Sequence, residues 1–171
     1  WHGLVRNIAF TLLEPYAKWK YHISIEKLNN PEKRPFLILM NHQTGFDQFF
    51  IGMAVEGPVY YLATEDIFSL GWISRLLDFL VAPIPIKKQT TDLQAIKSCV
   101  KVAKEGGTIA LFPEGNRTFH GKTLYFKPSI VKLIRLIKLP VVTMRLEGGY
   151  GVHPRWSDVV RRGSMKAYPS R

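Results

Sequence analysis

Short apolar runs alternate with helical patterns along this chain of 171 residues. Runs of this length, bounded by turn or helix signals, are typical of strands that are buried on both faces of a sheet. They lie at residues 36–40, 59–62, 81–86, 108–112 and 141–144. We expect a strand at each of them.

Helical periodicity is clearest from Thr91 to Lys104. Thr91 and Gln94 have the spacing of a capping box, and Gly106-Gly107 ends the pattern. The apolar positions of this segment fall on one face, which makes Cys99 a core residue. They are Ile96, Cys99, Val100 and Ala103.

A second helix is expected to begin near Pro128, because proline is tolerated in the first helical turn. Its apolar and basic positions fall on opposite faces. They are Ile130, Ile134 and Ile137 on one side and Lys132, Arg135 and Lys138 on the other. We interpret the basic face as solvated, with a membrane contact as the alternative.

Strands that alternate with helices predict an α/β fold with a mostly parallel sheet flanked by helices and joined by right-handed crossovers. The length and the apolar share of 46% allow one sizeable core. No internal repeat, low-complexity tract or linker interrupts the chain. We therefore expect a single domain over residues 1–171, with a catalytic core at 21–171.

Two segments have the character of lipid-binding surfaces. Residues 1–20 form an amphipathic pattern with a tryptophan near each end and a kink expected at Pro15, and such a helix can lie in a membrane interface. Residues 68–80 are apolar nearly all round, which fits either core burial or contact with an acyl chain or membrane. Charges interrupt every candidate for a bilayer-spanning stretch.

Lysine and arginine exceed aspartate and glutamate by 24 to 13, which gives a net charge of +11. A protein with this positive charge attracts polyanions. The sequence has no zinc-ligand spacing, RNA-recognition aromatic signature or basic zipper, so we expect an anionic membrane surface rather than nucleic acid as the partner. The single cysteine excludes an intramolecular disulfide and fits a reducing compartment.

The first chemical motif is Asn41-His-Gln-Thr-Gly-Phe-Asp47, which directly follows an apolar run. A turn through Gly45 would bring the Asp47 carboxylate onto the His42 imidazole. A carboxylate at one ring nitrogen fixes the tautomer, and the other nitrogen can then take a proton from an alcohol. No serine or cysteine stands in a nucleophile motif, so we expect His42 to activate a hydroxyl of the substrate for direct attack on a thioester.

The second motif is Phe112-Pro-Glu-Gly-Asn-Arg117, which follows another apolar run. Proline and Gly115 impose a tight loop, Glu114 can anchor it, and Arg117 offers a bidentate fork for a phosphate. Both motifs are expected at the carboxyl ends of strands, where ligands bind in open α/β sheets.

In these motifs the chain resembles the lysophosphatidic acid acyltransferase family, the 1-acylglycerol-3-phosphate O-acyltransferases among the glycerolipid acyltransferases. Residues 41–47 match the family pattern Asn-His-x-Ser-x-x-Asp with Thr44 at the serine position, and Phe112–Thr118 is similar to Phe-Pro-Glu-Gly-Thr-Arg-Ser. Residues 82–88 look like the second family block, with Lys88 in place of its arginine, and 139–144 look like the proline-containing fourth block. The resemblance covers residues from about 22 to 150.

The resemblance implies that a fatty acyl group moves from acyl-CoA or acyl-carrier protein to the free sn-2 hydroxyl of a lysophospholipid, without a metal or bound cofactor. It makes His42 the base and Asp47 its orienting group. Lys88, Glu114, Gly115 and Arg117 then belong to the acceptor site. It also implies peripheral or monotopic binding to the cytoplasmic face of a membrane. Backbone N–H groups could stabilise the oxyanion of the transition state.

Three alternatives stay open. The first is an acyltransferase that acts on a different lysolipid or on an amino-lipid. The second is a cysteine acyl-transfer enzyme that uses Cys99, which its apolar helical position disfavours. The third is a non-catalytic basic module that binds a membrane or nucleic acid.

Overall fold

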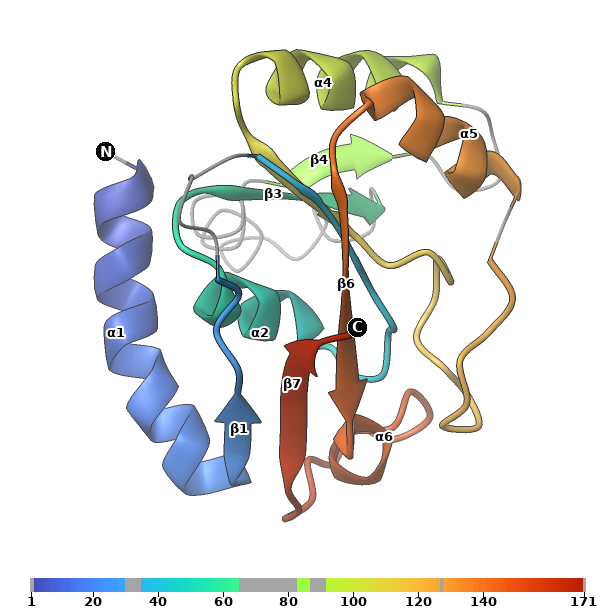
Figure 1. Ribbon diagram of the computed structural model, residues 1–171. Coiled ribbons are helices and arrows are strands. Elements are labelled where there is room, and N and C mark those ends of the chain that lie inside the picture. The colour runs from blue at the N-terminus through green and yellow to red at the C-terminus, as the bar shows by residue number, and fades with distance from the viewer. Residues whose placement is uncertain (1, 30–34, 65–82, 87–91, 127, 171) are drawn as a thin grey trace.

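The computed structural model describes residues 2–29, 35–64, 83–86, 92–126 and 128–170 (Figure 1). Within these ranges, seven strands form one sheet in the order β1-β7-β6-β2-β5-β3-β4. Neighbouring strands run parallel, apart from the antiparallel pair β6 and β7. The strands are β1 (Ile23–Ile25), β2 (Leu37–Met40), β3 (Val59–Thr64), β4 (Pro83–Ile86), β5 (Thr108–Leu111), β6 (Val141–Glu147) and β7 (Met165–Pro169).

Helices cover both faces of this sheet (Figure 1). α1 (His2–Tyr21) and α2 (Asp47–Ala54) lie on one side, and α4 (Leu93–Lys104) and α5 (Pro128–Ile137) lie on the other. A short helix, α6 (Gly149–Val152), follows β6. The expected α/β architecture with a mostly parallel sheet is therefore confirmed.

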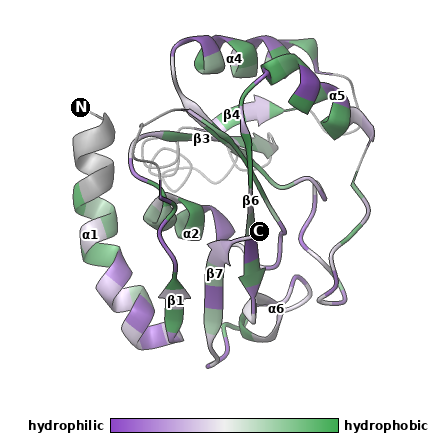
Figure 2. Ribbon diagram, in the orientation of Figure 1, coloured by the Kyte–Doolittle hydropathy of each residue, from purple (hydrophilic) through white to green (hydrophobic). Residues whose placement is uncertain are grey.

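The central strands contribute to a hydrophobic core on each face of the sheet. In β2, Ile38 packs into the cluster that contains Phe50 of α2, whereas Leu37 packs into the cluster that contains Cys99 and Leu133. Alternate residues of a strand point to opposite faces, so a strand covered by helices on both sides must be apolar throughout. All four residues of β5 are buried, as this requires. In β6, which Figure 2 shows mostly in the hydrophobic colours, only Met144 and Leu146 are buried.

The predicted strands are confirmed, with small changes at their ends. β3 and β6 continue beyond the predicted ends, to Thr64 and Glu147, and β5 stops one residue short of Phe112. Residues 81–82 and the apolar segment 68–80 lie outside the described part of the chain.

The predicted start of α4 is wrong. Its N-cap is Asp92, whose carboxylate accepts hydrogen bonds from the backbone N–H groups of Gln94 and Ala95, each at 3.0 Å. A capping box at Thr91 would begin the helix one residue too early. Aspartate is as good an N-cap as serine or threonine, so the sequence held two candidates at adjacent positions. Cys99 is fully buried, as expected.

α1 packs on the body of the protein through a face that is only partly apolar. The Phe10 ring lies over Gly52 of α2, where a Cβ atom would come within 2.5 Å of it. One turn further on, Glu14 forms ion pairs with Lys18 at 2.8 Å and Lys27 at 3.0 Å. Lys27 also donates to the backbone carbonyl of Met53 at the end of α2. These contacts fix which side of α1 faces the solvent.

The outward face of α1 is apolar. Its large hydrophobic side chains are exposed by 54% at Ile8, 71% at Leu12, 48% at Tyr16 and 76% at Trp19. Among the described residues, no helix has the length and hydropathy needed to span a bilayer.

The connections that follow β2 and β5 lead in opposite directions along the sheet. β2 leads through α2 to β3 on one side, whereas β5 leads through α5 to β6 on the other side, and α2 and α5 cover opposite faces. Where neighbouring parallel strands lead away in opposite directions, their carboxyl ends leave an open crevice for ligands. His42 follows the end of β2, and Glu114 follows the end of β5.

Candidate active site

His42 and Asp47 form a hydrogen-bonded pair at this crevice. The His42 Nδ1 atom lies 2.8 Å from Asp47 Oδ2. The imidazole is 20% exposed, whereas the carboxylate is fully buried. Because a carboxylate only accepts hydrogen bonds, Nδ1 carries the proton in the neutral imidazole, which leaves Nε2 unprotonated. The predicted approach of these side chains is confirmed.

Asp47 is held in place by the turn that precedes α2. It is the first residue of that helix, and its carboxylate accepts from the backbone N–H groups of Gln43 at 2.6 Å and Thr44 at 3.0 Å. The Thr44 hydroxyl also donates to it at 2.5 Å and accepts from the N–H of Phe46 at 2.9 Å. Thr44, which is fully buried, thus gives the carboxylate a hydroxyl donor in a position where serine would serve equally.

Glu114 joins the two motifs. One carboxylate oxygen accepts from the backbone N–H of His42, and the other accepts from the N–H of Leu124, both at 2.9 Å. The side chain is buried, and a further bond from the Thr118 N–H to the His42 carbonyl, at 2.8 Å, links the same segments. Glu114 thus holds the loop after β5 against the histidine, with both oxygens directed at backbone donors.

Gly115 and Arg117 form the rest of this loop. Gly115 has φ +69°, a left-handed conformation that favours glycine, and its N–H donates to the Phe112 carbonyl at 2.9 Å. The Arg117 side chain is partly exposed and extends over Gly45, with Nη1 3.9 Å from the point where a Cβ on Gly45 would lie. Lys88, the other expected phosphate ligand, lies outside the described residues.

Aromatic rings stack on the imidazole of His42 and on that of a second histidine, His153. The Phe112 ring stacks on His42 with a centroid distance of 4.1 Å and an interplanar angle of 16°. On the far side of the turn, Phe46 stacks with His153 at 5.1 Å and with Tyr21, the last residue of α1, at 6.2 Å. His153 follows α6 and was not among the candidate residues, because only the position of β6 beside β2 brings it here and the sequence has no local signal for that pairing.

Cys99 has no access to this site. It is fully buried in the hydrophobic core, and burial raises the pKa of its thiol to about 11. A neutral, buried thiol is a poor nucleophile. Within the described ranges, His, Cys, Asp and Glu side chains form no group of three or more that could hold a metal ion.

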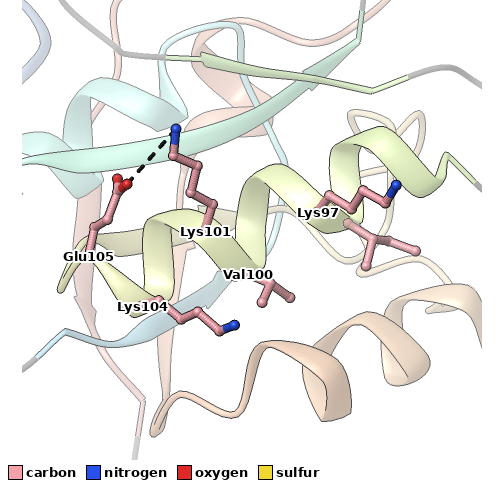
Figure 3. A pocket seen from close by; sticks show the side chains of 6 residues that line it. Lys97, Val100, Lys101, Lys104 and Glu105 are labelled. Atoms are coloured by element: carbon pink, nitrogen blue, oxygen red, sulfur yellow. Dashed lines mark ion pairs between the residues drawn. The ribbon is translucent and has the colours of Figure 1, made fainter.

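Two surface hollows lie at different distances from the motifs. One of about 220 Å³ reaches Asn41 and Pro113, which adjoin His42 and Glu114 in the chain, and it includes Arg145 and Phe126 in its wall. Another of about 510 Å³ lies along α4 (Figure 3), where all its lining residues belong to that helix or its C-cap. The lysines of this second hollow are Lys97, Lys101 and Lys104.

The combination of an α/β sheet, a histidine paired with a buried aspartate and an arginine loop at one crevice defines a candidate acyl-transfer site. The model of the acyltransferase family matches residues 22–147, which contain both motifs. The chain belongs to the acyltransferase family.

Proteins named 1-acyl-sn-glycerol-3-phosphate acyltransferase are similar to it. The Bacillus subtilis protein is 26% identical over 141 residues, which cover 82% of this chain and 67% of that protein. The Limnanthes alba protein is 27% identical over 162 residues, which cover 88% of this chain and 52% of that protein. The chain thus spans about two thirds of the bacterial relative and about half of the plant relative.

A solved structure has the same fold. The crystal structure of the 1-acyl-sn-glycerophosphate acyltransferase PlsC from Thermotoga maritima matches with a TM-score of 0.69 and 22% sequence identity. The match covers 96% of this chain and 70% of that one.

Proposed function

We propose that this chain transfers a fatty acyl group from a thioester donor to the sn-2 hydroxyl of 1-acylglycerol-3-phosphate, which gives phosphatidic acid. The observation that carries the proposal is the 2.8 Å contact between His42 Nδ1 and the buried Asp47 carboxylate, because it leaves Nε2 as a base on a partly exposed imidazole. The names of the relatives support the choice of acceptor.

The proposed reaction is a single displacement. His42 Nε2 takes the proton from the acceptor hydroxyl as its oxygen bonds to the thioester carbonyl carbon. Asp47 stabilises the imidazolium that forms. The carbon–sulfur bond of the tetrahedral intermediate then breaks, and the leaving thiolate takes the proton from the imidazolium. The products are the new ester and a free thiol, and acyl-CoA and acyl-carrier protein both fit this chemistry.

Arg117 is proposed to bind the acceptor phosphate, with Lys88 as a further cation. A guanidinium can form two parallel hydrogen bonds to a phosphate, and Arg117 lies over the turn between His42 and Asp47. Gly115 and Glu114 contribute by setting the shape of the arginine loop rather than by touching the acceptor.

This function is tested with purified protein, 1-acylglycerol-3-phosphate and a panel of acyl-CoA and acyl-carrier-protein donors, with the products resolved by mass. His42→Ala should lower turnover on the order of 10²–10⁴-fold without unfolding the protein. His120→Gln is the matched control, because His120 is exposed. The proposal fails if no donor yields phosphatidic acid or if His42→Ala turns over at the wild-type rate.

We also propose that the protein acts while bound peripherally to the cytoplasmic face of a membrane. The exposed apolar side chains of α1 supply the insertion surface, and Lys18 and Lys20 in its last turn can reach anionic headgroups. The net charge of +11 favours the same surface. Tyr21 at the end of α1 stacks on Phe46 beside Asp47, so a lipid-bound α1 would stand next to the catalytic turn.

Liposome sedimentation tests this proposed membrane contact of α1. Binding should rise with anionic lipid content and weaken with salt. A part of the binding should resist salt, because it comes from the exposed apolar side chains of α1. Leu12→Glu should remove most of that salt-resistant part, whereas Leu93→Glu, at an exposed leucine at the start of α4, should not. Equal loss in both variants would place the membrane contact elsewhere.

A further inference from the structure

The side chains of His153 and of Arg117, the residue proposed to bind phosphate, both lie close to Gly45. Its Cε1 and Nδ1 atoms are 3.8 and 3.9 Å from the point where a Cβ on Gly45 would lie, and Arg117 Nη1 is 3.9 Å from the same point. The two side chains therefore approach each other over the turn that joins His42 to Asp47. Any ligand held by Arg117 above Gly45 would lie within reach of the imidazole.

The segment that carries His153 is fastened to the catalytic turn. The N–H of Tyr150 donates to the side-chain oxygen of Gln43 at 3.1 Å. The backbone of α6 comes so close that a Cβ on Gly149 would lie 2.8 Å from Thr44 Cγ2. The His153 N–H donates to the Gly149 carbonyl at 2.9 Å, which ends the helix. These contacts fix the position of the His153 imidazole relative to the turn between His42 and Asp47.

The ring of His153 is held by stacking, yet one of its two nitrogens lacks a hydrogen-bond partner among the described residues. Phe46 stacks on it with a centroid distance of 5.1 Å and an interplanar angle of 24°. Nδ1 is buried and has no hydrogen-bond partner among the described residues, although the residue as a whole is partly exposed. A buried nitrogen without a partner is costly and needs an explanation such as a ligand or a functional role. No partner fixes the tautomer, so the ring can present an N–H group to a ligand.

Burial and the charge of Arg117 favour the neutral form of His153 in the free protein. Burial and the nearby positive charge of Arg117 lower its pKa, and Asp158 and Asp47 oppose this only in part. A phosphate dianion between the two side chains would cancel the charge of Arg117 and favour the imidazolium. Near neutral pH, ligand binding therefore adds a proton to His153.

We propose that His153 is a second ligand for the acceptor phosphate, which takes up a proton when a phosphomonoester binds and thereby disfavours lysolipids with phosphodiester head groups. The inference rests on the proposed function, because it assumes that the acceptor phosphate binds at Arg117. A phosphomonoester carries about 1.5 to 2 negative charges at pH 7, as phosphoserine does, whereas a diester carries one. The imidazolium of His153, as a second cation beside Arg117, would recognise the additional negative charge of the monoester.

The test compares two water-soluble acceptors, hexanoyl lysophosphatidate and its methyl phosphodiester. His153→Gln should raise the KM for lysophosphatidate about 10-fold or more, since a charge-assisted hydrogen bond is lost. The KM for the thioester donor and kcat should stay within about twofold to threefold, and the preference for the monoester over the diester should shrink. His120→Gln serves as the control. Unchanged discrimination, or an equal rise in the donor KM, would overturn the proposal.

Calorimetry measures the proton directly. Lysophosphatidate binding to the wild type, in two buffers of different ionisation enthalpy at pH 6.5 to 8, should take up more protons than binding to His153→Gln. Protonation of the acceptor itself is common to both proteins and cancels. If His153→Gln does not fold, His153→Asn is used in the same comparison, and equal proton uptake by the wild type and the variant refutes the inference.

The two proposals fail separately. A wild-type protein that makes no phosphatidic acid refutes the proposed function. A wild type that makes it, with a His153→Gln variant of equal KM and equal proton uptake, refutes only the role of His153.

Discussion

Replacement of Asp47 by asparagine should separate its effect on catalysis from its effect on folding. Both carboxylate oxygens of Asp47 are surrounded by donors: Thr44 reaches Oδ1, and Gln43 and His42 reach Oδ2. An asparagine amide oriented with its oxygen at the Oδ2 position keeps the bonds to Gln43 and His42, and the Thr44 hydroxyl can turn to accept from the amide. The imidazole tautomer is then retained, but the charge that stabilises imidazolium is lost.

The expected cost follows from these contacts. Turnover should fall on the order of 10²–10⁴-fold, as for loss of a general base. The free energy of unfolding should fall by about 1.5–3 kcal/mol, the usual value of one hydrogen bond to a charged group. Thr44→Val is the matched control: it removes the 2.5 Å bond to the carboxylate, so it should cost comparable stability while turnover changes only a few-fold.

A double-mutant cycle tests whether Asp47 acts through His42. Turnover is measured for His42→Ala, Asp47→Asn and the double variant, with stability from urea denaturation of each. If Asp47 acts through the imidazole, Asp47→Asn should have almost no further effect when His42 is already alanine. An equal loss of turnover in both backgrounds would refute this reasoning and leave Asp47 with a structural role only.

Three further outcomes are expected. Arg117→Ala should raise the KM for lysophosphatidate about 10-fold to 100-fold and leave the donor KM nearly unchanged, because a charge-assisted bond to phosphate is lost; steady-state kinetics with each substrate varied would show a donor effect if the assignment is wrong. Thiol-blocking reagents at pH 8 should leave turnover intact and react with Cys99 only after unfolding, because its pKa is raised to about 11, well above this pH. Gly52→Ala should detach α1 by pushing against the Phe10 ring, so that protease cleaves within α1 faster while activity on a short-chain acceptor persists; unchanged cleavage would contradict that contact.

The central strands and the His–Asp motif could be predicted because each has a simple physical signature. A strand buried on both faces must be apolar throughout, as in β2 and β5. Gly45 and the spacing of His42 from Asp47 were enough to predict their contact. Both inferences depend on neighbours in the chain rather than on distant ones.

The elements that escaped prediction depend on distant contacts. α2 is buried over most of its length, so it has no polar face to mark it as a helix. β1 and β7 are short, and their pairing joins segments far apart in the sequence. His153 follows β6, whose end was expected at Met144, and only the position of β6 beside β2 brings it to the catalytic turn. A single sequence contains no local signal for such pairings.

The pairing of β1 with β7 also has a consequence for how the protein is made. β1 at Ile23–Ile25 bonds to the sheet through β7 at Met165–Pro169, some 140 residues later in the chain. Contacts of such large sequence separation form late, because a long loop must be closed first. On the ribosome, the segment that carries α1 emerges early, yet β1 cannot join the sheet until β7 has been synthesised. The apolar outward face of α1 is therefore available to a membrane or a chaperone before the catalytic crevice is complete.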